Sequence, residues 1–149
     1  KNISKKDFKK FHPSGNLGAQ LRTVEELMIT GNKIPLVNEN LNMKKALQII
    51  SSKKLGTLIV QNNKKITTGI ITDGQIRRFN TTSNNLRDLS VKKVMTKNPI
   101  SINQDTLAEK ALSIMNTKKI TSLCVHKDKN VKKTVGILHI HDILQSNIH

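Results

Sequence analysis

The chain has 149 residues, a formal charge of +16 at pH 7 and a hydrophobic share of 36%. This length allows one domain or two small domains that share a core, and no apolar run approaches the ~18 residues of a membrane-spanning helix. The charge comes from scattered lysines, and with three Phe, no Trp and no Tyr the stacking platforms for single-stranded nucleic acid are nearly missing. We therefore expect neither a membrane protein nor a nucleic-acid-binding protein.

The single cysteine, Cys124, lies inside an apolar run and is predicted to be a small buried side chain. One cysteine cannot build a disulfide framework, and the sequence has no signal-peptide pattern. A cytoplasmic location is therefore expected. The sequence begins at Lys1 and not at Met, so we expect it to be part of a longer protein.

Hydrophobic periodicity predicts a mixed α/β chain. The predicted elements of the first half, in chain order, are a short turn at 24–28, an edge strand at 34–37, a helix at 43–54, strands at 55–60 and 66–72, and a short helix at 74–80. Asn42 is predicted to cap the first long helix. Met43 begins that helix's apolar stripe, so it is predicted to be a core residue.

The second half repeats this order. Its predicted elements are a short strand at 99–102, a helix that Thr106 and Glu109 start as a capping box, a strand at 121–126, a basic hairpin loop at 127–133, a strand at 135–139 and a helix from 142. Residues 24–28 match 91–95 at an offset of 67 residues, and Gly69 matches Gly136 at the same offset. A duplicated β-α-β-β-α unit is therefore predicted, an α/β (α+β) fold in which two such repeats pack as a pseudo-twofold pair.

Each repeat contains a strand that opens with glycine and runs directly into a short helix, at 69–76 and at 136–143. The first backbone N–H groups of a helix lack partners inside the helix, which suits an anionic ligand. We therefore expect two such ligand positions, or one that works and one that is degenerate.

These motifs, found twice and in the same order, resemble a tandem pair of cystathionine-β-synthase (CBS) domains, known as a Bateman module. The stretch His-Pro-Ser-Gly-Asn-Leu-Gly at 12–18 is similar to the junction between a sugar-isomerase (SIS) domain and a CBS pair in arabinose 5-phosphate isomerases. The stretches at 72–78 and 139–144 are similar to two further segments of that family. The resemblance implies a junction at 1–22, a first CBS repeat at 23–86 and a second at 87–149. It also implies an SIS domain ahead of Lys1.

The resemblance implies that Thr72 binds a phosphate and that Asp142 binds ribose hydroxyls. From the residues alone, Thr72 is equally an ordinary β-branched strand residue and Asp142 equally a helix N-cap. In the first repeat, Gln75 stands where the family pattern has a ribose-binding Asp. The second repeat is therefore expected to hold the better site.

Four basic side chains, Arg77, Arg78, His139 and His141, are predicted to line the cleft between the repeats. Arginine binds phosphate or carboxylate with bidentate geometry, although two solvated surface arginines are the alternative. His139 and His141 would share one face if the strand continued, as a metal site could use. No third ligand lies nearby in the sequence, so we predict no metal site and a contribution to phosphate or sugar binding.

No nucleophile–base–acid pattern and no GxxxxGK[ST] phosphate loop occur in the sequence. His12 matches a position that the isomerase family uses in its active site, and we expect it to be idle without the SIS domain. The chain alone is therefore predicted not to catalyse. By resemblance, the parent protein would interconvert ribulose 5-phosphate and arabinose 5-phosphate for synthesis of the lipopolysaccharide sugar Kdo.

The resemblance favours a regulatory module whose cleft binds a nucleotide or nucleotide sugar, such as CMP-Kdo or CMP, with no required cofactor. An adenine nucleotide is the alternative ligand. A second hypothesis is a structural module without a physiological ligand, because CBS pairs commonly dimerise. In either case we expect a homo-oligomer.

Overall fold

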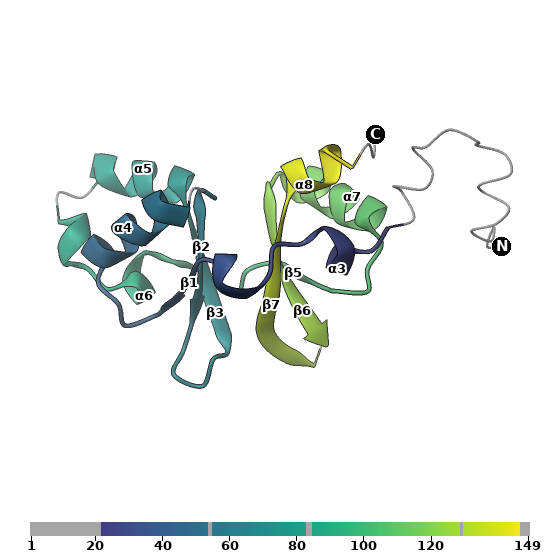
Figure 1. Ribbon diagram of the computed structural model, residues 1–149. Helices are drawn as coiled ribbons and strands as arrows, with labels where there is room; N and C mark the ends of the chain where they lie inside the picture. Colours follow the sequence, from purple (N-terminus) through teal and green to yellow (C-terminus); the bar gives the residue numbers. More distant parts are fainter. Residues whose placement is uncertain (1–21, 54, 83–84, 129, 147–149) are drawn as a thin grey trace, which may run out of the picture.

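Two β-sheets lie side by side at the centre of the molecule, and each carries its helices on the side away from the other sheet (Figure 1). The computed structural model describes residues 22–53, 55–82, 85–128 and 130–146. The predicted junction motif at 12–18, with His12, lies outside these residues. No helix in the described part of the chain is long and apolar enough to cross a membrane.

The first half forms a four-stranded sheet in the order β1-β2-β3-β4. Its strands are β1 (Leu36–Asn38), β2 (Thr57–Gln61), β3 (Thr67–Thr72) and β4 (Thr96–Lys97). Its helices are α4 (Met43–Lys53), α5 (Asp73–Thr82) and α6 (Val91–Val94), with short 3₁₀ turns η1 (Gly31–Lys33) and η2 (Leu86–Asp88). Met43 is fully buried, and Asn42 Oδ1 accepts a hydrogen bond from the Lys45 N–H at 3.0 Å. The predicted core position and the predicted cap are both confirmed.

The second half forms a three-stranded sheet in the order β5-β6-β7. Its strands are β5 (Ser101–Asn103), β6 (Ser122–Asp128) and β7 (Val131–His139), and its helices are α7 (Ala108–Lys118) and α8 (Ile140–Leu144). In both halves the first strand pairs in parallel with the second, and the second pairs antiparallel with the third. The duplicated β-α-β-β-α unit and the fold class are therefore confirmed.

Three local predictions for the second half are wrong. The basic stretch at 127–133 is largely strand, because β6 and β7 continue pairing to Asp128↔Val131. Helix α8 begins at Ile140 and not at Asp142. Thr106 does not cap α7: the N-cap is Leu107 and makes no side-chain cap bond, and the Ala108 N–H donates instead to the Arg22 carbonyl at 2.8 Å.

That bond reflects an exchange of segments between the halves. The segment at 22–29, which includes α3 (Val24–Leu27), packs on the second half, and Val24 is fully buried in the core cluster that contains Ala108 and Ile143. Conversely, Val91 of the segment between the repeats is fully buried in the core of the first half. The ranges 23–86 and 87–149 stay a prediction from the repeat; in space, each half is completed by the segment that precedes the other.

Two methionines anchor the exchanged segments. The Met28 side chain lies directly over Gly136 of β7, and the Met95 side chain lies over Gly69 of β3. Ile29 and Ile137 also exchange two backbone hydrogen bonds, of 2.9 and 3.0 Å. Glycine is favoured at both strand positions because a side chain there would meet the methionine.

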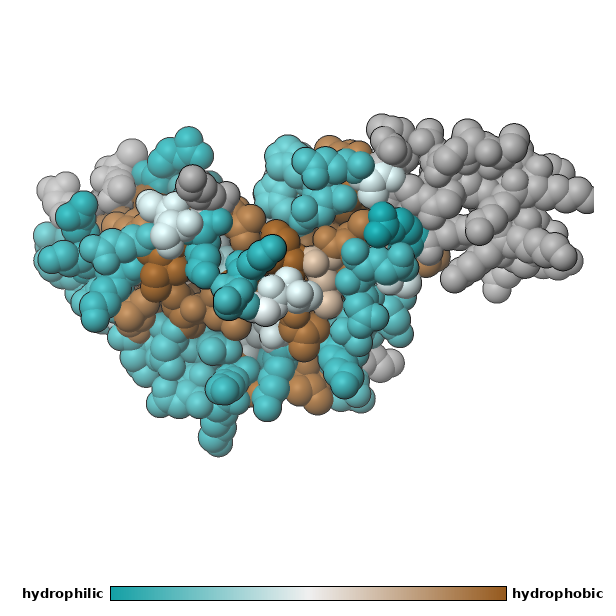
Figure 2. All heavy atoms as spheres, in the orientation of Figure 1, coloured by the Kyte–Doolittle hydropathy of each residue, from teal (hydrophilic) through white to brown (hydrophobic). Residues whose placement is uncertain are grey.

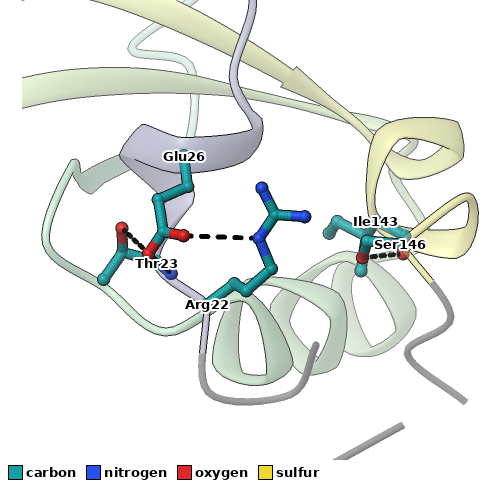
Figure 3. A network of polar contacts seen from close by, with 5 residues as sticks. All are labelled: Arg22, Thr23, Glu26, Ile143 and Ser146. Carbon is teal, nitrogen blue, oxygen red and sulfur yellow. Dashed lines mark hydrogen bonds and ion pairs between the residues drawn. The ribbon is translucent and has the colours of Figure 1, made fainter. Parts of the chain in front are cut away.

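The start of α3 is held by a small polar network beside the end of α8 (Figure 3). The Thr23 backbone N–H and hydroxyl donate to Glu26 Oε1 at 3.1 and 3.2 Å, and Arg22 Nε donates to Glu26 Oε2 at 3.3 Å. The backbone bond from Thr23 lowers the pKa of Glu26, with smaller contributions from the Thr23 hydroxyl and Arg22.

The two sheets meet through a small apolar cluster of Ile34, Ile59, Cys124 and Ile137. Cys124 is fully buried there, which confirms its prediction, and burial raises the pKa of its thiol to about 12. At the same interface the hydroxyls of Thr67 and Thr134 lie 2.6 Å apart.

Candidate functional site

A cleft of about 810 Å³ lies between the two halves, at the edge where β3 runs into α5 and β7 runs into α8. Figure 2 shows the hollow between the two lobes at this edge. Its lining residues come from five segments, at 55–57, 70–78, 96–100, 119–122 and 139–141. Both repeats and the connection between them therefore build one site.

The wall from the first repeat is organised by Gln75. Its Oε1 accepts from the Thr72 N–H at 2.9 Å, and its Nε2 donates to the Thr96 hydroxyl. Thr72 Oγ1 in turn accepts from the Gln75 N–H at 3.4 Å. Both polar atoms of the Gln75 carboxamide are thus used to tie the end of β3 to β4.

In the wall from the second repeat, side chains also bond backbone N–H groups at the junction between strand and helix, but the residues differ. Asp142 Oδ2 accepts from the His139 N–H at 3.2 Å, and His139 Nδ1 accepts from the His141 N–H at 3.2 Å. The two imidazole rings stack with their centroids 4.7 Å apart and their planes at 21°. Residues 139–142 therefore form a closed capping unit at the start of α8.

The pKa of His139 is lowered, which favours the neutral imidazole. Burial lowers its pKa, nearby His141 lowers it further, and Asp142 raises it. Since Nδ1 is the acceptor of the His141 N–H, the single ring proton of neutral His139 resides on Nε2. This wall therefore offers a neutral N–H donor.

The expectation that free helix N–H groups hold an anion is wrong for the first residue of each helix. The Asp73 N–H donates to the Gly56 carbonyl at 3.0 Å, and the Ile140 N–H donates to the Thr121 carbonyl at 2.8 Å. The N–H groups of Gln75 and His141 are bonded within their own capping units. With these four N–H groups bonded, the charged side chains of the cleft supply attraction for an anion.

Those side chains make the cleft basic. Among the described lining residues, the cations Arg77, Arg78 and Lys119 outnumber the one carboxylate, Asp73. Arg77 and Arg78 follow one another on the exposed side of α5. Two arginines at a cleft wall suit a phosphate or carboxylate group.

The structure brings five of the six predicted ligand residues to this cleft: Thr72, Arg77, Arg78, His139 and His141. Asp142 is not among the lining residues and is the third residue of α8, so it is not the N-cap. His139 and His141 do not share a strand face, because β7 ends at His139; the turn into α8 stacks their rings instead. In the part of the chain described, no cluster of three or more His, Cys, Asp or Glu could hold a metal ion.

Several lining residues were not predicted from the sequence. They include Gly56, Ile100 and Lys119 from the connections, and Thr96 and Ser122 from the first positions of β4 and β6. Lys119 has a left-handed backbone, with φ of 56°, and Gly56 has φ of 68°. The repeat offers one signal that could have found some of them, since Thr121-Ser122 matches Gly56-Thr57 at an offset of 65 residues.

Comparison with known sequences identifies the repeated unit. The CBS domain family matches residues 24–80 and 91–148. The chain is 41% identical over 147 residues to arabinose 5-phosphate isomerase KdsD of Francisella tularensis, covering 97% of this chain and 44% of that protein. It is 33% identical over 149 residues to KdsD of Escherichia coli K12, covering 99% and 44%. The chain thus spans less than half the length of these relatives.

Solved structures share the fold at lower identity. The CBS-domain protein ATU1752 from Agrobacterium tumefaciens superposes with a TM-score of 0.76 at 18% identity, covering 87% of this chain and 96% of that one. CBSX2 in complex with AMP gives 0.73 at 22% identity, covering 83% and 94%. The CBS pair of MJ0100, in complex with 5′-methylthioadenosine and S-adenosyl-L-methionine, gives 0.73 at 20% identity, covering 84% and 94%.

The matched family, the duplicated topology and the shared fold agree. The chain belongs to the CBS domain family and is a tandem CBS pair.

Proposed function

We propose that this CBS pair is the regulatory module of an arabinose 5-phosphate isomerase and that its cleft binds a nucleotide or nucleotide sugar. The observation that carries the ligand class is the charge of the cleft, where three cations and one carboxylate lie among polar groups of both repeats. The KdsD relatives, at 33–41% identity, support the parent enzyme. In that parent an SIS domain would catalyse, and this chain alone would not.

CMP-Kdo is the proposed ligand. It is the activated end product of the pathway that arabinose 5-phosphate feeds, so its binding would give feedback control. Its phosphate and carboxylate match the two arginines of α5, which can each bind an oxyanion with two N–H groups. An adenine nucleotide is the second candidate, supported by the AMP complex of the similar CBSX2 fold.

The exchanged segment at 22–29 offers a route from the cleft to whatever precedes this chain. It pairs with β7 at Ile137, two residues before His139 of the cleft wall. Leu27 and Met28 pack against the core that holds Ile140 and Ile143 of α8. A ligand that shifts the His139–His141 unit would therefore act on this segment directly, which is the linkage that regulation needs.

Calorimetric titration of the chain with CMP-Kdo, CMP, AMP and ATP tests the proposal. The variants are Arg77→Gln, which removes a cation from the cleft, and Arg87→Gln, which makes the same change on an exposed residue outside it. Loss of one hydrogen bond to a charged group costs about 1.5 kcal/mol, so Arg77→Gln should weaken binding about tenfold. Arg87→Gln should leave the affinity as it is.

Asp142 needs a separate variant because its carboxylate accepts the N–H of His139, the N-cap residue of α8. Asp142→Asn keeps an oxygen that accepts the His139 N–H and removes the charge. If Asp142 also binds ribose hydroxyls, this variant should weaken nucleotide binding and keep the melting temperature nearly unchanged.

A folded wild-type chain that binds none of the four compounds would contradict the proposed ligand class. The alternative hypothesis would then be favoured, in which the chain is a homo-oligomerisation module without a physiological ligand. Sedimentation equilibrium on the same samples would measure the assembly that this hypothesis requires. The cytoplasmic location stays a prediction from the sequence.

A further inference from the structure

Ser122 is the first residue of β6 and belongs to the lining of the cleft. It lines the cleft although the residue is only 8% exposed. It pairs directly with His139 of β7, so both side chains are on one face of the sheet. Cys124, two residues further along β6, belongs to the cluster that contacts the first sheet. By strand alternation, Ser122 and His139 therefore point toward the other repeat.

The Ser122 hydroxyl is shielded from solvent and has no hydrogen-bond partner among the described residues. Protein interiors leave few such groups unpaired, because a buried hydroxyl without a partner costs free energy. A serine hydroxyl turns between staggered positions about a single bond. It can therefore reach a group placed in the cleft without movement of the backbone.

The two walls differ in the chemistry that they offer. The α5 wall presents Arg77 and Arg78, which suit an oxyanion. The Ser122 and His139 wall presents an uncharged hydroxyl beside an imidazole whose proton is on Nε2. A ligand that satisfies both walls needs an anionic end and an uncharged polar end.

We propose that the Ser122 hydroxyl is a specificity-determining group of the cleft, which hydrogen-bonds an uncharged polar atom of the ligand while the α5 arginines hold its anionic part. The polar atom would be a sugar hydroxyl or an atom of a base edge. This role rests on the proposed function and deepens it, because the cleft then selects nucleotide-type molecules over inorganic anions.

Ser122→Ala tests the proposal, with Ser101→Ala as the matched control on an exposed residue that does not line the cleft. Each variant is titrated with CMP-Kdo, CMP, AMP and pyrophosphate, and its melting temperature is measured without ligand. Ser122→Ala should lower the affinity for the nucleotide that the wild type binds by three- to tenfold and leave the affinity for pyrophosphate unchanged. Its melting temperature should stay the same or rise, because the unpaired hydroxyl is gone.

The outcomes separate this inference from the proposed function. If the wild type binds none of the nucleotides, the proposed function fails and the role of Ser122 fails with it. If the wild type binds a nucleotide and Ser122→Ala binds it equally well, only the role of Ser122 fails, and a solvent molecule is its partner. Equal losses for nucleotide and pyrophosphate, or a lower melting temperature, would also overturn this role, since the hydroxyl would then contact the anion or support the fold.

Discussion

A methyl group added at Gly136 should weaken the docking of the exchanged segment on the second repeat. An ideal Cβ at Gly136 would lie 2.9 Å from Met28 Cγ and 3.2 Å from the Ile29 carbonyl oxygen. Ordinary contacts between carbon atoms are about 3.5–4.0 Å, so both neighbours must move. The methionine can turn aside, but the carbonyl belongs to backbone that is hydrogen-bonded to Ile137.

The equivalent change in the first repeat, Gly69→Ala, gives a reference for the cost in stability. At Gly69 the three atoms nearest to such a Cβ all belong to the Met95 side chain, with Cγ at 2.7 Å and Cβ at 3.0 Å. Overpacking costs about 1–3 kcal/mol, and replacing glycine returns about 0.4–1 kcal/mol through the unfolded chain. Gly136→Ala, which also meets backbone, should therefore lower the free energy of unfolding by about 2 kcal/mol. Gly69→Ala should lower it by about 1 kcal/mol.

Urea denaturation followed by circular dichroism measures these values, and a double-mutant cycle with Met28→Ala tests their cause. Removing the Met28 side chain beyond Cβ should relieve part of the Gly136→Ala penalty, so the double variant should be about 1 kcal/mol more stable than the sum of the single changes. Met28→Ala combined with Gly69→Ala is the control and should be additive, because Gly69 faces Met95. An additive Met28–Gly136 cycle would refute the proposed contact between the exchanged segment and β7.

Three further predictions concern polar groups that are buried or partly buried. Burial lowers the pKa values of His139 and His126, so the folded state binds their protons less readily than the unfolded chain. The stability that these two neutral histidines contribute should be fully present above about pH 6.5 and should be lost as the pH falls below it. In urea titrations from pH 7.5 to 5, the double variant His139→Asn and His126→Asn should lose most of this dependence of the free energy of unfolding on pH. The thiol of Cys124, with its pKa raised to about 12, should react with a thiol reagent only as fast as the chain opens, and rapid labelling of the native protein would contradict its burial. Thr134→Val should cost about 1–3 kcal/mol because it leaves the buried Thr67 hydroxyl without this partner. Thr67→Val should cost less, because Thr134 keeps its hydrogen bond with Cys124, and the double variant should cost less than the sum of the two; additive losses in urea unfolding would show that the two hydroxyls are not paired.

The local pattern of the sequence was enough to predict the duplicated unit. Short-range signals, such as the stripe that begins at Met43 and the Asn42 cap, depend on neighbours within one helix and are confirmed. The cap of α7 failed because its partner is not local. The Arg22 carbonyl serves the Ala108 N–H, and no pattern around Thr106 indicates a chain segment more than 80 residues upstream.

For the candidate site, too, the sequence predicted some features and missed others. Thr72, Arg77, Arg78, His139 and His141 follow the two strand-to-helix motifs, and the structure places all five at one cleft. The hydrogen bonds of His139 and His141 could not be predicted in the same way, because α8 begins two residues earlier than expected and this changes which of their atoms are free.

By itself the sequence determined the repeat, the order of strands and helices, and the basic, polar character of the strand ends, because these follow from spacing along the chain. The tertiary structure alone decided that each half is completed by the segment preceding the other, and that residues 96–100 and 119–122 share a cleft with both motifs. It also decided that Asp142, inside the first turn of α8, bonds the N-cap residue His139, and that the Ser122 hydroxyl in the cleft lining has no partner in the described part of the chain. Those features depend on contacts between residues far apart in the chain, which packing creates and local periodicity does not record.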